Sequence, residues 1–167
     1  VESRENRVER MGYFTRVFCK SSSKPNVKTI MEQLHLKGYL VQSNLDENEL
    51  LSEDWTEFEL FYKEGKFPIL VEHNSIKQSD GLAEQEIEAF KEAIGKPGWF
   101  DLSKKKVLRH LDQTNFILCN QLPTSDIDDD GYNLNGALME LFVSVCEGMI
   151  QCDAEGFYLG NVILVKE

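Results

Sequence analysis

Hydrophobic residues recur along this chain of 167 residues with two spacings, one typical of strands and one typical of helices. Alternating aromatic and β-branched residues predict strands at 13–19, 39–41, 58–62, 67–73, 115–121, 149–152 and 158–165. Apolar residues three and four positions apart predict helices at 25–38, 82–94, 103–111 and 134–146. The last helix is apolar on more than one face, so we expect it to be the most buried helix of the fold.

These elements form two β-α-β-β units on either side of a helical middle, and the sequence around Gly38 echoes that around Gly148. The order predicts one α+β domain over residues 11–167, with a mostly antiparallel sheet and helices on one face in a ferredoxin-like arrangement. The turn residues Gly95-Lys96-Pro97-Gly98 suggest a half-domain boundary near 95–103. Arg and Glu alternate in residues 1–10, which we expect to be a disordered or tag-like segment.

The net charge of −11 is unevenly distributed along the chain. Residues 1–37 hold eight Lys or Arg and four Asp or Glu, whereas the remainder holds ten and twenty-five. This balance disfavours nucleic acid and anionic membranes and favours a basic protein or a divalent cation. The alternative is that the acidity only keeps the protein soluble.

The four cysteines show neither metal-ligand spacing nor a disulfide framework, and each lies among apolar neighbours. We therefore expect buried free thiols and a cytoplasmic location. No apolar run approaches the roughly 20 residues that a membrane-spanning helix needs.

Seven carboxylates and no basic residue occur between Asp46 and Glu59. A large aromatic side chain among exposed charges is typical of a protein-binding surface. The candidate partner-binding residues are Asp46, Glu47, Glu49, Glu53, Asp54 and Trp55. In the alternative interpretation, Trp55 packs beneath the predicted hairpin while the acidic side chains face water.

A second acidic segment has carboxylates at alternate positions ahead of a glycine, Gly131. The candidate metal ligands are Asp126, Asp128, Asp130 and the carbonyl of Tyr132. The segment resembles the first half of an EF-hand loop, which implies calcium as the ligand. Ala137 stands where that family has a bidentate Glu, so we expect any calcium affinity to be weak. The alternative is a cluster that caps the following helix.

Catalysis is the less favoured interpretation, because no nucleotide-binding loop, nucleophile elbow or zinc-binding histidine pattern occurs. Asp153 and Glu155, in the turn before the last strand, are the candidate residues for a carboxylate-based hydrolase. The sequence therefore favours a non-catalytic acidic binding module without a cofactor, such as an inhibitor or immunity-type protein for a basic partner. Calcium binding is the first alternative and hydrolysis the second.

Overall fold

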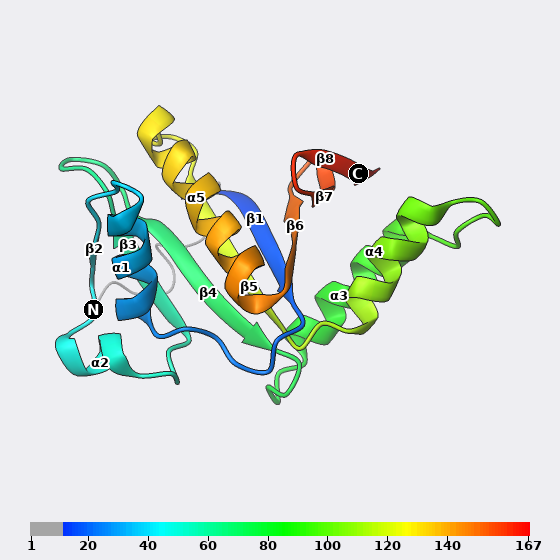
Figure 1. Cartoon of the computed structure of the whole chain (residues 1–167), viewed down its shortest axis with the longest axis horizontal. Helices are drawn as coiled ribbons and strands as arrows, with labels where there is room; N and C mark the ends of the chain where they lie inside the picture. Colours follow the sequence, from blue (N-terminus) through cyan, green and yellow to red (C-terminus); the bar gives the residue numbers. More distant parts are fainter. Residues whose placement is uncertain (1–11) are drawn as a thin grey trace.

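The computed structural model describes residues 12–167 and shows one eight-stranded antiparallel sheet with five helices (Figure 1). The predicted tag-like segment lies outside the described residues. The strands, in chain order, are β1 Gly12–Cys19, β2 Gln42–Ser43, β3 Glu57–Phe61, β4 Ile69–Ser75, β5 Phe116–Pro123, β6 Gly148–Cys152, β7 Gly156–Leu159 and β8 Val162–Lys166. The helices are α1 Val27–Leu36, α2 Glu47–Leu51, α3 Leu82–Ile94, α4 Leu102–Asp112 and α5 Asp129–Cys146.

The sheet has the strand order β2-β3-β4-β5-β1-β6-β7-β8. β1 and β5, the first strands of the two halves of the chain, are therefore neighbours at the centre of the sheet. β1 and β5 pair along their full length, from Gly12 opposite Pro123 to Cys19 opposite Phe116. β5 is buried over nearly its whole length and β1 mainly over its second half, where alternate residues enter different cores. The predicted α+β class and antiparallel sheet are confirmed.

The helices divide between the two faces of the sheet, which differs from the expectation that they share one. α1 and α5 pack with Val17 and Leu118 in the larger core. α3 and α4 pack with Phe18 and Ile117, whose side chains point to the opposite face. The break at 95–98 thus joins two helices of a hairpin, and one sheet incorporates strands from both sides of that break.

The two halves of the chain have different connections, so the predicted ferredoxin-like repeat is not confirmed. After α1 the chain runs to the edge strand β2, whereas after α5 it runs to β6 beside β1. The strand predicted at 39–41 is displaced to Gln42–Ser43, and the one predicted at 158–165 divides at Gly160, which has φ +57°.

Two helix boundaries also differ from their predictions, in each case because of capping. α1 begins at Val27 instead of at Pro25, and Asn26 is its N-cap, accepting a hydrogen bond from Thr29 N at 2.8 Å. α5 begins at Asp129 instead of 134, with Asp128 as its N-cap. Within the described residues, none of the helices combines the length and the hydropathy that crossing a bilayer would require.

Candidate functional site

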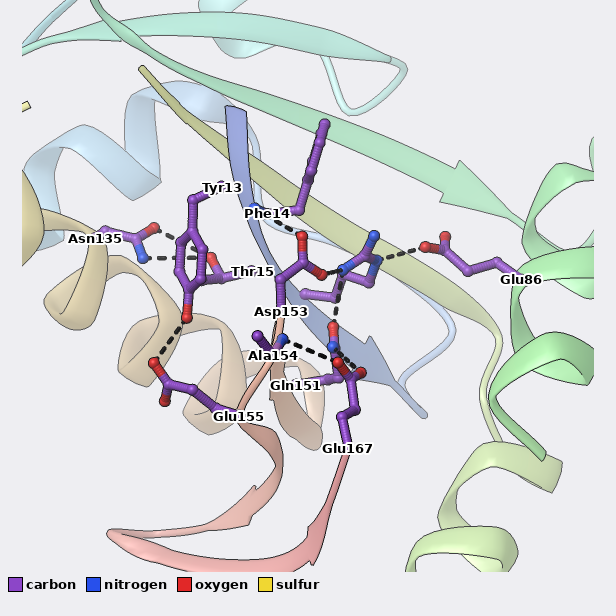
Figure 2. Close-up of polar contacts among 11 residues, drawn as sticks. Tyr13, Phe14, Thr15, Glu86, Asn135, Gln151, Asp153, Ala154, Glu155 and Glu167 are labelled. Atoms are coloured by element: carbon purple, nitrogen blue, oxygen red, sulfur yellow. Dashed lines mark hydrogen bonds and ion pairs between the residues drawn. The ribbon is translucent and has the colours of Figure 1, made fainter. Parts of the chain in front are cut away.

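A group of ionic side chains surrounds Arg16 on the α3 side of β1, and we call it the Arg16 cluster (Figure 2). The Arg16 side chain is only 14% exposed. Its Nε bonds Glu86 of α3, while Nη1 donates to Asp153 at 2.6 Å and to Gln151 at 2.9 Å. The guanidinium also lies 5.5 Å from the ring centre of Phe90. The cluster therefore ties β1 to α3 and to the β6–β7 turn.

Glu167, which follows β8, extends this network. Glu167 accepts hydrogen bonds from Gln151 Nε2 at 2.5 Å and from Ala154 N at 3.0 Å (Figure 2). Beside it, Glu155 accepts from Tyr13 at 2.8 Å and also from Tyr158. Burial, and then the bond to Glu155, raises the pKa of Tyr13, while the bond to Glu155 raises the pKa of Tyr158 to about 12. Both phenols are therefore neutral hydrogen-bond donors at physiological pH.

The two carboxylates predicted for a hydrolase are committed to these structural contacts. Asp153 binds Arg16 through Oδ1, while its Oδ2 accepts from Phe14 N at 3.2 Å. Glu155 is exposed and bonded to two phenols. Two carboxylates balance the single charge of Arg16, so the cluster does not offer a free cation to an anionic substrate. This arrangement supports fold stability more than catalysis.

A buried polar trio, Thr15, Asn120 and Asn135, lies on the opposite face of β1; Figure 2 shows Thr15 and Asn135. Asn135 of α5 accepts from Asn120 Nδ2 at 2.8 Å and donates to Thr15 Oγ1 at 3.2 Å. These residues are at most 4% exposed, and their bonds fix α5 against β1 and β5.

Two lysines of the β3–β4 hairpin bind the Asp-rich loop at 126–130. Lys63 Nζ lies 2.9 Å from Asp128 and 3.0 Å from Asp130, and Lys66 Nζ lies 3.5 Å from Asp126. The hydrogen bond from Lys63 lowers the pKa of Asp128, and the same bond raises the pKa of Lys63. Asp128 also caps α5 by accepting from Gly131 N at 3.2 Å.

Gly131 has a packing role that differs from the turn predicted for a calcium loop. A Cβ atom at this position would lie 2.6 Å from Ile127 and 2.7 Å from the hydroxyl oxygen of Tyr62. Tyr132, the predicted carbonyl ligand, lies in the first turn of α5. Among residues 12–167, no three or more histidine, cysteine or acidic side chains converge as a metal site would require. Calcium binding at this loop stays a prediction. It requires Lys63 and Lys66 to move away from the carboxylates. Calorimetry with calcium, with Asp128→Asn as the control, tests it.

The other acidic segment presents its carboxylates outward, and we call this set the α2 surface: Asp46, Glu47, Glu49, Glu53 and Asp54. All five residues are exposed. A capping box orders the helix, since Asp46 accepts from Glu49 N at 2.9 Å and Glu49 accepts from Asp46 N at 2.8 Å. In the described part of the chain, none of the five carboxylates has a basic nitrogen within the 4.0 Å of an ion pair.

Trp55 lies beneath the α2 surface instead of on it. The side chain is 6% exposed, packs edge-on against Phe58 at 5.1 Å and donates from Nε1 to Pro25 O at 2.9 Å. Lys24 Nζ lies over the indole ring and donates to Glu53 O at 2.6 Å. In this conformation Trp55 anchors the acidic segment to the core and does not contact solvent as a docking residue would.

A polar hollow of about 270 Å³ adjoins the α2 surface and is lined by Glu53, Asp54, His73 and Asn115 among others. The His73 ring lies edge-on to Trp55 at 5.9 Å and is tilted against Phe116 at 5.1 Å, measured between ring centres. Burial and, less strongly, the charge of Lys24 lower the pKa of His73 to about 4. The imidazole is therefore neutral at physiological pH.

All four cysteines are buried free thiols, as the sequence predicts. Burial raises the pKa of Cys119 to about 12 and that of Cys152 to about 11, which suppresses their reactivity.

Sequence reasoning missed two features of the surface. The partners of Arg16 lie 70 to 137 positions away, so no local spacing predicts the cluster. An exposed pair of aromatic residues, Trp99 and Phe100, follows the Gly-Pro-rich break, where the sequence was interpreted only as a boundary. Comparison of the chain with protein-family models, curated proteins and solved structures finds no match.

Proposed function

We propose that this protein is a non-catalytic binding module whose α2 surface docks onto a basic macromolecule. The observation that carries the proposal is that these five carboxylates form no ion pair within the described residues, although Lys63 and Lys66 bind the Asp-rich loop. Lys24, whose charge interacts with Asp54 and Glu53, donates instead to the Glu53 carbonyl. Unpaired carboxylates that lie close together repel one another, and a cationic partner relieves that repulsion. The net charge of −11 acts in the same direction at longer range.

The α2 surface is also ordered before any partner arrives. The capping box fixes α2, and the contacts of Trp55 and Lys24 fix the segment that follows it. A preordered surface loses little conformational entropy on binding, so more of the electrostatic attraction is expressed as affinity. An inhibitor or immunity-type protein, which presents carboxylates to the cationic cleft of a toxin or nuclease, is the concrete version of this function.

A charge-reversal series tests the proposal. A basic protein captured from a lysate of the source organism is purified, and its Kd is measured by calorimetry with the wild type, Glu47→Lys and Glu53→Lys. We expect each reversal to weaken binding at least tenfold at low salt, since like charges in an interface are strongly unfavourable. Glu84→Lys, an exposed acidic residue on α3, is the matched control and leaves the Kd unchanged. Equal effects of all three substitutions would contradict the assignment of the α2 surface.

A further inference from the structure

The loop between α3 and α4 carries the most exposed aromatic side chains of residues 12–167. Trp99 is 84% exposed, Phe100 88% and Leu102 75%. The helical hairpin that carries them extends away from the sheet, and this loop is its far end (Figure 1). We call residues 95–102 the hairpin tip. Three large apolar side chains exposed within four consecutive residues indicate a surface that a partner covers.

The charge around the hairpin tip has the opposite sign to that of the molecule. Residues 95–111 hold five Lys or Arg and one Asp, whereas the rest of the chain holds thirteen basic and twenty-eight acidic residues. The single acidic residue, Asp101, caps α4 by accepting from Lys104 N at 3.1 Å. The flanking carboxylates are Glu92, which is exposed in the last turn of α3, and Asp112, which forms an ion pair with Lys91 at 2.8 Å.

The basic side chains continue the apolar ones along α4. Leu102, Lys106 and Arg109 are exposed and follow one another at helical spacing, on the side away from buried Val107 and Leu111. Lys105 Nζ lies 5.7 Å from the ring centre of Trp99 and donates to the Trp99 carbonyl at 2.5 Å. The tip therefore presents aromatic and aliphatic groups at its end and a band of ammonium and guanidinium groups behind them.

We propose that the hairpin tip docks onto an anionic lipid bilayer, with Trp99, Phe100 and Leu102 in the interface and the basic residues of α4 at the phosphate level. Tryptophan prefers the interfacial region, and each lysine or arginine near an anionic surface adds attraction. A bilayer accepts a convex apolar tip without a preformed groove. Two aromatic side chains and a leucine offer only about 500 Å² of contact, below the roughly 800 Å² per partner of a standard protein interface.

The acidic body of the protein does not prevent this contact. α4 has 11 residues and is therefore about 16 Å long, which exceeds the Debye length of about 8 Å at physiological ionic strength. The repulsion between the acidic body and the lipid is screened over that distance, while the basic residues of α4 lie close to the lipid. The net charge of the whole chain disfavours anionic lipid, but the charge of residues 95–111 is positive.

Tryptophan fluorescence tests the proposal because Trp99 is exposed and the other tryptophan, Trp55, is buried. The full chain is titrated with phosphatidylcholine vesicles that contain or lack phosphatidylserine, some carrying brominated acyl chains. We expect a blue shift and bromine quenching only with phosphatidylserine, and neither in Trp99→Phe. Replacing Lys104, Lys105 and Lys106 together with Gln should lower the partition coefficient on the order of a hundredfold.

Exposed residues far from the hairpin tip provide matched controls. Leu40→Ala removes an 86% exposed apolar side chain and Lys28→Gln removes an exposed lysine of α1, so both should partition as the wild type does. Circular dichroism verifies that each variant is folded. The proposal is overturned if Trp99 emission is unchanged by anionic vesicles, if neutral vesicles bind equally well, or if single-stranded oligonucleotides shift the emission in place of vesicles.

Discussion

The two acidic segments of this protein have similar compositions and opposite surroundings. In the Asp-rich loop, Lys63 and Lys66 approach three carboxylates, and Asp128 caps a helix of 18 residues. On the α2 surface five carboxylates face water without a cation within ion-pair distance in the described residues. Carboxylates with internal partners stabilise the fold, whereas those without partners are available to another molecule. The same residue type thus has two roles, which depend on what lies opposite it.

In the Arg16 cluster, two carboxylates share one partly buried cation, so substitution there should cause the largest loss in the free energy of unfolding. Arg16→Met leaves Glu86 and Asp153 without their cation in a partly buried setting, so we expect a loss of about 3 kcal/mol in the free energy of unfolding. Urea denaturation measures it. Arg16→Lys keeps the charge and should lose less, although it lacks the guanidinium fork. A loss below about 0.5 kcal/mol, the range of surface substitutions, would show that the cluster does not stabilise the fold.

His73 lines the hollow beside the α2 surface and makes the stability of this region depend on pH. Burial and, less strongly, the charge of Lys24 lower its pKa to about 4. The unfolded chain, with a histidine pKa near 6.5, then takes up a proton before the folded one. Stability should therefore fall as the pH decreases from about 6.5 to 4, by about 2 kcal/mol after allowance for partial exposure. His73→Phe should remove this part of the pH dependence; a profile identical to that of the wild type would be incompatible with the buried neutral imidazole.

Asp128→Ala should lower the Tm by a few degrees, because it removes both the α5 cap and the bond to Lys63. The hydrogen bond from Lys63 lowers the Asp128 pKa, so this contribution is present above the ordinary aspartate pKa and is lost on acidification. Differential scanning calorimetry at neutral and acidic pH measures both effects. Asp129→Ala, an exposed neighbour, is the control; equal Tm values for the two variants would argue against a special role of Asp128.

Substitutions on the α2 surface should cause the smallest change in the free energy of unfolding. Glu47→Gln and Glu53→Gln should change the free energy of unfolding by less than about 0.5 kcal/mol, because both residues are exposed and neither carboxylate forms an ion pair in the described structure. Urea denaturation of the double variant at low salt measures the change. A clear destabilisation would reveal an internal role for these side chains and remove the contrast between the two acidic segments.

Much of the fold could be predicted from the sequence because its elements are strongly amphipathic. Val27, Ile30 and Leu34 form the buried stripe of α1, and Ile87 and Ile94 belong to that of α3, at helical spacing. The split of the last strand could not be predicted, since Gly160 interrupts a continuous run of strand-forming residues. The placement of the helices on two faces was also missed, because periodicity shows which side of a helix is buried but not which face of the sheet it meets.

The candidate site was predicted less well because its interactions are non-local. The sequence indicated acidic surfaces at 46–59 and 126–130, but the lysines that bind the second come from a hairpin about 60 residues earlier. Trp55 was proposed as a docking residue, yet its apolar ring contributes more when it is buried against Phe58 than it would in a charged loop. The hairpin tip was missed because the charge was summed over long stretches of the chain. The net charge of −11 does not reveal that residues 95–111 hold five basic residues.

The ionic-strength dependence of association tests whether the α2 surface is the docking face. The rate constant for binding the captured basic partner is measured by stopped flow over a range of salt concentrations, for the wild type and for a variant with Glu47, Glu49 and Glu53 changed to Gln. We expect the wild-type rate constant to decrease steeply with salt and that of the variant to decrease much less, with little change in stability. Identical salt dependences for the two proteins would contradict the claim that the α2 surface is the docking face.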